Sequence, residues 1–236
     1  MTVTTVARCW TDVKIFLDEW SKNPPDGYRD AVTSSAAARL RGRVDKFEQR
    51  RRELADAALH TLADLGYART SLRTIAENTS FSHGLLHYYF ADKIELITYC
   101  VQRYKAACTE RYSVLVAEAT TPEELAIACG DGLAATLADA PLMHRLWYDL
   151  RNQSMFEEGF RADVAEIDAG LQAMIWDLVR AYAELAGAQP SCTAAEAYAL
   201  FDGLFLHALQ QYLGGAETAL DELRQRCRDL LPRLVG

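Results

Sequence analysis

The chain has 236 residues, of which 25 are basic and 33 acidic, so its formal charge is −8. Half of the residues are hydrophobic and a quarter are charged, which is typical of a folded globular protein and excludes a largely disordered one. No apolar run approaches the roughly 18 residues of a membrane span, and the N-terminus lacks a secretory-signal pattern. Six scattered cysteines without a C-x-x-C pair indicate reduced thiols in a cytoplasmic protein, not disulfides or a zinc site.

The charge is unevenly distributed along the chain. Residues 39–52 include seven basic and two acidic residues, whereas residues 100–236 include 11 basic and 20 acidic ones. A basic segment ahead of an acidic body is typical of a DNA-binding module joined to a domain of another kind. A solvated helix start would also explain the basic run taken alone.

The first 44 residues predict an N-terminal extension. Its apolar residues recur at alternating spacings of four and three, which predicts an amphipathic helix that docks on protein, with the stripe Val6, Trp10, Val13, Leu17 and Trp20. Residues 23–27 are rich in proline and end this helix. Residues 31–43 are interpreted as a flexible basic arm, and three of its side chains are expected to contact DNA: Arg39, Arg41 and Arg43.

The rest of the chain predicts helices throughout, because no segment alternates apolar and polar residues with period two. Asp45 and Glu48 form a capping box for a helix that Gly66 ends. Later helices are expected to start near Lys93, Pro122, Pro141 and Phe160, and then over residues 193–213 and 216–231. The fold class is therefore all-α.

The last two predicted helices indicate a dimer. The helix over residues 193–213 is apolar on two faces, formed by Tyr198, Phe201, Phe205 and Tyr212 and by Leu200, Leu204 and Ala208. The final helix has one apolar stripe of Leu220, Leu223, Cys227 and Leu230. A helix that is apolar on two sides must be buried on two sides, so we expect these two helices to form a four-helix homodimer interface.

Residues 70–93 predict a helix-turn-helix. Ser71 or Thr70 can cap a short helix with an apolar edge at Leu72, and residues 78–80 interrupt it. Ser82 can cap a second short helix, in which Leu86 and Phe90 point inward. The outward positions of this second helix, which would enter a DNA major groove, are His83, Gly84, Leu85, His87 and Tyr88.

The segment of about 45 residues from Arg52 to Leu96 resembles the N-terminal module of the tetracycline-repressor (TetR) family of bacterial regulators. The matching residues are Leu54, Ala57, Ala58, Gly66, Tyr67, Thr70, Ser71, Ile75, Ala76, Glu77, Ser82, Gly84, Leu86, Tyr89, Phe90, Lys93 and Leu96. Three positions depart from the family pattern: Ser80 replaces the turn glycine, His87 a tyrosine and Leu85 a small polar residue. These departures bear on the operator sequence rather than on DNA binding.

The resemblance implies roles for the module's residues. His83 and Leu85 are expected to reach base edges, and Gly84 is expected to allow close backbone approach. His87 is expected to contact either a base edge or a phosphate. Phosphate contacts are expected from Thr70, Arg73, Tyr88 and Lys93, and Ser71 and Ser82 are expected among the DNA-binding residues. His83 and His87 are also spaced as metal ligands on a helix, but the sequence offers no third ligand nearby.

The resemblance also implies an effector site in the C-terminal half. The helix after Pro141 has two aromatic and two basic residues at i, i+3, i+4 and i+7, and with residues of other helices the expected lining is Tyr104, Cys108, His144, Trp147, Tyr148, Arg151, Phe205 and His207. Arg151 beside aromatic rings would suit a ligand with an anionic end. Packing of the same residues in the core is the alternative interpretation.

The sequence contains no catalytic constellation: it has no G-x-S-x-G, no glycine-rich phosphate loop and no H-E-x-x-H. We therefore expect no enzyme, cofactor or metal. The predicted domains are an extension over 1–44, a helix-turn-helix domain over 45–95 and a helical ligand-binding and dimerisation domain over 96–236. The expected function is a ligand-released, homodimeric repressor whose partners are double-stranded operator DNA and a small-molecule effector, without a membrane. A helical adaptor with a non-functional DNA module is the alternative.

Overall fold

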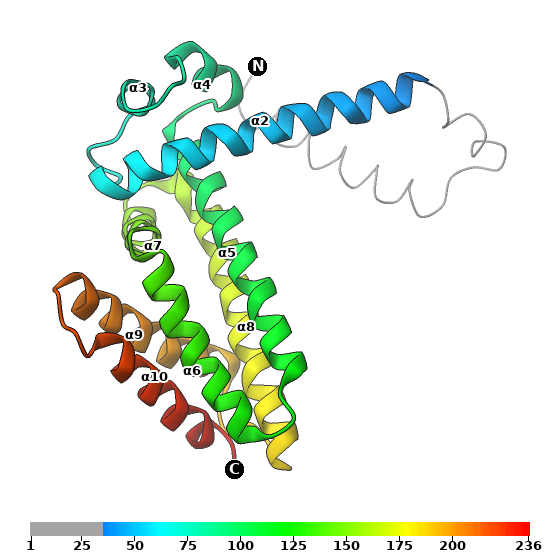
Figure 1. The fold of residues 1–236 in the computed structure, drawn as a ribbon, viewed down its shortest axis with the longest axis vertical. Helices are drawn as coiled ribbons and strands as arrows, with labels where there is room; N and C mark the ends of the chain where they lie inside the picture. The colour runs from blue at the N-terminus through cyan, green and yellow to red at the C-terminus, as the bar shows by residue number, and fades with distance from the viewer. Residues whose placement is uncertain (1–34) are drawn as a thin grey trace. The chain divides into compact units, whose positions relative to one another are not determined.

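The computed structural model describes residues 35–236, with side chains from Asp45 onward except that of Ala63, so the helix expected over residues 6–20 and the side chains of Arg39, Arg41 and Arg43 lie outside the described part. The chain divides into two units, residues 1–52 and 53–236, and the sites described below lie in the second. No strand occurs among the described residues, which confirms the all-α prediction (Figure 1).

Helix α2 spans Ser35–Leu65 and begins ten residues before the expected start at Asp45. The interpretation of the basic segment as a flexible arm is therefore wrong from Ser35 onward. The physical reason is helix propensity, because residues 36–41 are alanine, leucine and arginine, which all favour a helix. The C-terminal end agrees with the sequence: Gly66 has a φ of 74°, and its N–H donates to the Leu62 carbonyl.

The helix-turn-helix forms as predicted, with α3 over Leu72–Glu77 and α4 over His83–Tyr89. The hydroxyl oxygen of Ser71 accepts from Thr74 N–H, and that of Ser82 accepts from Leu85 N–H, so each serine caps its helix. None of the non-glycine residues that the structure describes has a positive φ. The turn between α3 and α4 is therefore made without a left-handed residue at Ser80.

The remaining helices follow the predicted order, and their bounds are α5 Lys93–Glu118, α6 Pro122–Asp139, α7 Pro141–Ser154, η1 Glu158–Phe160, α8 Arg161–Ala186, α9 Ala194–Leu213, α10 Ala219–Leu230 and η2 Leu231–Leu234. Helix α5 packs along α8, and α10 packs along α6 (Figure 1). No single helix among the described residues is long and apolar enough to cross a membrane, although α6 and α7, bent by 89°, would pass together on length and composition.

The described helices pack around two clusters of buried apolar residues. The first joins the end of α2 and the helix-turn-helix to α5, α7 and the start of α8, with Leu86, Phe90 and Trp147 among its most buried residues. The second lies between α6, α8, α9 and α10. Within the described chain, Cys100, Cys108, Cys129, Cys192 and Cys227 are all free thiols. Helix α7 therefore belongs to the core that holds the DNA-binding module.

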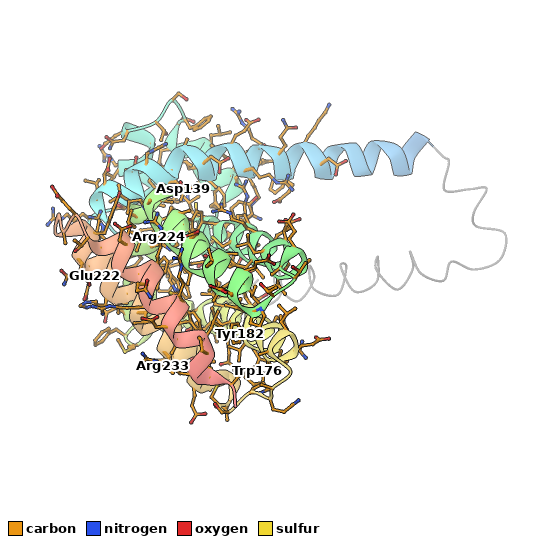
Figure 2. The ribbon with its side chains drawn as sticks, turned by 60° about the horizontal axis from the view of Figure 1, so that its bottom comes forward. Asp139, Trp176, Tyr182, Glu222, Arg224 and Arg233 are labelled. Carbon is orange, nitrogen blue, oxygen red and sulfur yellow. The ribbon has the colours of Figure 1, made fainter. Side chains whose placement is uncertain are left out.

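Two residues of the apolar stripe on the final helix pack inside the protomer. Leu223 and Cys227, predicted at a dimer interface, are buried inside the protomer against α6. Helices α6 and α10 approach closely at Gly130, where an added Cβ would lie 2.7 Å from the Arg224 carbonyl oxygen. Figure 2 shows Glu222 and Arg224 on α10; Glu222 pairs with Arg226 on the same helix, whereas Arg224 pairs with Asp131 on α6 at 3.5 Å. Leu223 and Cys227 thus serve the fold of one subunit, whereas Leu220 and Leu230 are only half-buried, and the dimer interface through the last two helices stays a prediction.

Candidate DNA-binding and effector sites

Helix α4 presents a polar face to solvent. His83, Gly84, His87 and Tyr88 are exposed, and Leu85 is half-buried, whereas Leu86 is fully buried. Nothing lies within 4 Å of a Cβ added at Gly84, so another molecule can approach the backbone there. The structure brings all five outward positions of the sequence prediction onto one accessible helix, in the arrangement that major-groove reading requires.

Neighbouring side chains complete this surface. The side chain of Arg73 on α3 is 81% exposed and pairs with Glu77 at 3.0 Å, an exposed pair that a phosphate can replace at small cost. The rings of His83 and His87 meet edge to face at 4.5 Å. Among the described residues, no group of three or more His, Cys, Asp or Glu side chains could hold a metal.

Two residues expected to contact phosphate are engaged within the protein. Thr70 is buried, and its hydroxyl donates to the Gly66 carbonyl at 2.7 Å, so this side chain fastens the loop after α2 and does not face the DNA side. The Lys93 ammonium donates to the Tyr67 carbonyl at 3.1 Å and lies 3.7 Å from the Tyr67 ring centroid. Burial lowers the pKa of Lys93.

Tyr67 joins the DNA-binding module to the C-terminal half, a role that sequence reasoning did not assign. Its backbone N–H donates to the Asp149 carboxylate at 2.9 Å, and its hydroxyl donates to Glu157 at 2.7 Å. Its ring packs edge to face on Phe160, with the centroids 5.1 Å apart. Burial, followed by the bond to Glu157, raises the pKa of the Tyr67 hydroxyl, which therefore remains a donor. Asp149 lies on α7, so its hydrogen bond with the Tyr67 backbone connects the DNA-binding module to this helix.

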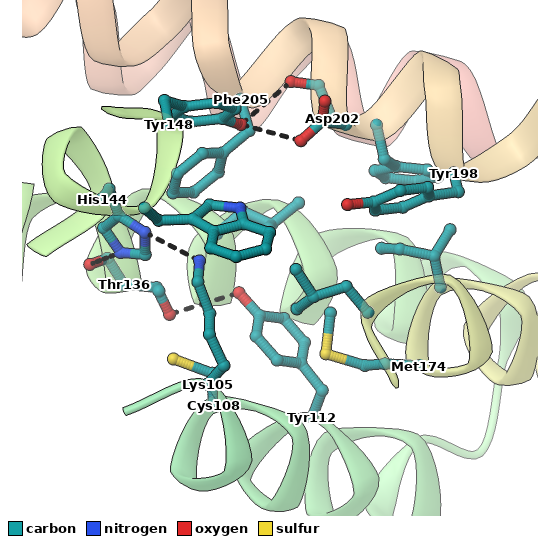
Figure 3. Close-up of a pocket in the computed structure, with 15 residues that line it drawn as sticks. Lys105, Cys108, Tyr112, Thr136, His144, Tyr148, Met174, Tyr198, Asp202 and Phe205 are labelled. Carbon is teal, nitrogen blue, oxygen red and sulfur yellow. Dashed lines mark hydrogen bonds between the residues drawn. The ribbon is translucent and has the colours of Figure 1, made fainter. Parts of the chain in front are cut away.

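The C-terminal half contains a partly open cavity of about 60 Å³ between α5, α6, α7, α8 and α9 (Figure 3). Five of the eight predicted effector residues line it: Cys108, His144, Trp147, Tyr148 and Phe205. The one-face spacing on α7 explains the convergence of three of them. Further lining residues that sequence reasoning missed include Lys105, Tyr112, Tyr198 and Asp202.

The other three predicted residues do not line the cavity. Tyr104 lies behind it, with its hydroxyl 3.0 Å from His144 Nε2. Arg151 pairs with Asp202 at 2.7 Å and with Asp168 at 3.5 Å, so its charge is already compensated. His207 is exposed, because it lies two positions from Phe205 and points away from the side of α9 that Phe205 occupies. The prediction that Tyr104, Arg151 and His207 line this cavity was therefore wrong.

Lys105 is the unexpected feature of the cavity. This side chain is only 8% exposed, and its ammonium lies 3.4 Å from His144 Nδ1. His144 Nε2 lies 3.1 Å from the Thr136 carbonyl oxygen, which can only accept, so Nε2 carries the proton and Nδ1 accepts from Lys105. Burial, reinforced by the Lys105 charge, lowers the pKa of His144 to about 3, so the imidazole is neutral.

The described geometry defines a helix-turn-helix DNA-binding protein with an internal cavity, and comparison with known proteins agrees. Residues 54–100 match the model of bacterial regulatory proteins of the tetR family, and residues 122–236 match the C-terminal domain of BetI-type transcriptional repressors. The regulator BetI of Burkholderia thailandensis is 31% identical over 166 residues, which cover 67% of this chain and 81% of that protein.

Solved structures share the fold. A TetR transcription regulator from Haloarcula marismortui has a TM-score of 0.66 at 17% identity, covering 80% of this chain and 100% of that one. A transcriptional regulator from Saccharomonospora viridis, solved in complex with choline, has a TM-score of 0.65 at 18% identity and covers 80% of this chain and 98% of its own. The chain belongs to the tetR family and is a DNA-binding transcriptional regulator of the repressor type.

Proposed function

We propose that this regulator is a cytoplasmic homodimer that leaves its operator when a small molecule occupies the cavity between α5 and α9. The observation that carries this proposal is the double role of α7. Trp147 and Tyr148 on this helix line the cavity, while Asp149, next in sequence, accepts a hydrogen bond from the backbone of Tyr67 in the loop between α2 and α3 of the DNA-binding module. A ligand that moves α7 therefore acts directly on the module.

The size of the cavity supports this mechanism. Ligand sites usually enclose roughly 300–1,000 Å³, whereas this cavity has about 60 Å³. All but the smallest ligands must move its walls, and α7 is one of them. A ligand that binds the conformation with the larger cavity more tightly than the conformation described here shifts the population toward the former. The size of this shift is set by the difference between the two affinities, and it changes the fraction of protein that can bind DNA.

Substitution of Asp149 tests this coupling. Compounds that raise the melting temperature of the wild-type protein are expected to weaken its binding to operator DNA. These compounds are expected to bind Asp149→Ala with an affinity within about threefold of that for wild type. Their effect on the DNA affinity of this variant is expected to be about tenfold smaller, because the hydrogen bond between Asp149 and Tyr67 is lost. Asp139→Ala, which removes an exposed carboxylate at the end of α6, is the control. Unchanged release in Asp149→Ala, measured by fluorescence anisotropy, would contradict the proposal.

We assign base reading to His83 and Leu85, with Gly84 admitting the DNA backbone or a base edge. Arg73, Ser71, Ser82, His87 and Tyr88 surround them and supply phosphate contacts. Arg39, Arg41 and Arg43 are proposed to contact DNA phosphates and so to increase affinity more than sequence selectivity. Lys93 can reach phosphate only after leaving the Tyr67 carbonyl. The resulting affinity depends on salt, because each neutralised phosphate releases counterions.

The dimer is proposed to form through the outer face of α9, which consists of Leu200, Gly203, Leu204 and His207. Leu200 is 47% exposed, and Gly203 has open space around it, so a second helix can approach closely. In a two-fold interface one Leu200→Glu substitution introduces two carboxylates, and we expect the dimer to weaken by about tenfold or more. Light scattering after size-exclusion chromatography measures this, with the exposed Val114→Glu on α5 as control. A fully dimeric Leu200→Glu variant would exclude this face.

A further inference from the structure

The ammonium of Lys105 is a buried cation at the wall of the effector cavity. It has three N–H donors, and His144 Nδ1 accepts one of them. Among residues 45–236, no carboxylate lies within 4.0 Å of it in an ion pair. A buried charge is costly unless it is paired, so the fold retains Lys105 at a position where an anion from outside would stabilise it.

The acidic residues around the cavity are already engaged. The Asp202 carboxylate accepts from the Tyr148 hydroxyl at 2.9 Å and pairs with Arg151. Asp168 accepts from the Tyr198 hydroxyl and also pairs with Arg151. Figure 3 shows Lys105 entering from α5 toward His144, and Asp202 entering from α9 toward Tyr148. The charged groups of α7, α8 and α9 thus bind one another and leave Lys105 without an anionic partner.

From these contacts we infer that the effector is a short aliphatic carboxylate whose carboxylate group pairs with the Lys105 ammonium. This inference rests on the proposed effector site and names its ligand class. The remaining walls, which include Leu133, Leu171 and Phe201, are apolar and suit the hydrocarbon part of such a ligand. A cavity of about 150 Å³ holds benzene, which has six non-hydrogen atoms, as butyrate does. The 60 Å³ present here is smaller than such an acid requires, so its binding must move the cavity walls, as the proposed function also requires.

The same geometry disfavours a quaternary ammonium ligand. The aromatic walls alone could surround such a cation, and the related Saccharomonospora viridis regulator was solved with choline. In this chain the Lys105 charge lies at the cavity wall, 5.4 Å from the centroid of Trp147, where a cation on the same ring would be repelled. The anionic preference therefore distinguishes this protein from that relative.

Isothermal titration calorimetry with sodium butyrate tests the inference, using the full-length protein at pH 7 and constant ionic strength. Wild-type protein is expected to bind butyrate, and to bind butyramide and choline chloride at least about tenfold more weakly, because only butyrate provides a charge-assisted hydrogen bond. Lys105→Met, which keeps an unbranched apolar side chain but removes the ammonium, is expected to weaken butyrate binding by about tenfold or more. Arg103→Met removes one exposed charge from the same helix and is expected to bind like wild type.

A pH series on the wild-type protein provides a second readout that needs no variant. Burial lowers the pKa of Lys105 to about 8. Butyrate affinity is therefore expected to be constant from pH 6 to 7.5 and to fall by up to about tenfold per pH unit above 8, as the ammonium loses its proton. The titratable and charged groups that face Lys105 are Cys108, His144, Arg151, Asp168 and Asp202. His144 remains neutral across this range.

Three outcomes would overturn the inference: no butyrate binding to wild type, equal affinity in Lys105→Met, or an affinity that does not change between pH 7 and pH 9. Choline binding without butyrate binding would show that the cavity is an effector site of another ligand class, so the proposed function would stand while this inference fails. Butyrate binding with the predicted losses, but without any effect on DNA binding, would confirm the ligand class and contradict the proposed coupling.

Discussion

Replacing Gly130 by alanine is expected to lower the melting temperature by about 4–10 °C, which corresponds to roughly 1–3 kcal/mol for a chain of this size. The added Cβ would lie 2.7 Å from the Arg224 carbonyl oxygen, and this neighbour is backbone that cannot rotate away. Helices α6 and α10 would have to separate. The buried contacts of Leu223 and Cys227 with α6 would then loosen.

The matched control is Gly170→Ala on α8, where nothing lies within 4 Å of the added Cβ. Because alanine favours a helix over glycine by about 1 kcal/mol, this variant is expected to be as stable as wild type or slightly more stable. Thermal unfolding followed by circular dichroism compares the two variants. Equal melting temperatures for both would show that the α6–α10 crossing is looser than described.

Adjacent leucines in α4 are expected to separate stability from DNA recognition. Leu86 is fully buried, so Leu86→Ala should cost about 2–5 kcal/mol and abolish operator binding as the helix-turn-helix loses its anchor. Leu85 is half-buried on the DNA-facing side, so Leu85→Ala should change stability by less than about 1 kcal/mol. It should nevertheless reduce discrimination at the base pair that Leu85 contacts by roughly 1–3 kcal/mol.

Circular dichroism and binding to a panel of operator variants measure both effects. The assignment of α4 would be wrong if Leu85→Ala retained the full base preference of the wild-type protein. It would also be wrong if Leu86→Ala bound the operator normally, because a helix without its buried anchor cannot hold the outward side chains in register.

Local signals predicted most of the fold. The caps at Ser71 and Ser82 and the left-handed Gly66 act within a few residues, so the sequence displays them directly. The start of α2 is not evident from the sequence, because an apparent capping box at Asp45 competes with the helix propensity of the residues before it. Local pattern alone does not decide between a cap and the interior of a longer helix.

The effector cavity is formed by residues that are distant in the sequence, so local patterns predicted only part of its lining. The spacing of His144, Trp147 and Tyr148 predicted a shared face, and these side chains do meet at the cavity. Arg151 has the same spacing, but its charge is compensated by Asp168 and Asp202, which lie on other helices. Lys105 was missed because its burial follows from the packing of α5 against α7 and α9, which no local pattern reveals.

Footprinting of the DNA upstream of the regulator's own gene tests the central claim most directly. We predict protection of two half-sites centred about 10 base pairs or a multiple apart, because the two α4 helices of a dimer enter successive major grooves on one side of the duplex. Protection should weaken steeply as salt rises, and it should disappear in Leu86→Ala. A folded wild-type dimer that protects no site even at low salt would contradict the account and would favour a helical adaptor that does not read DNA.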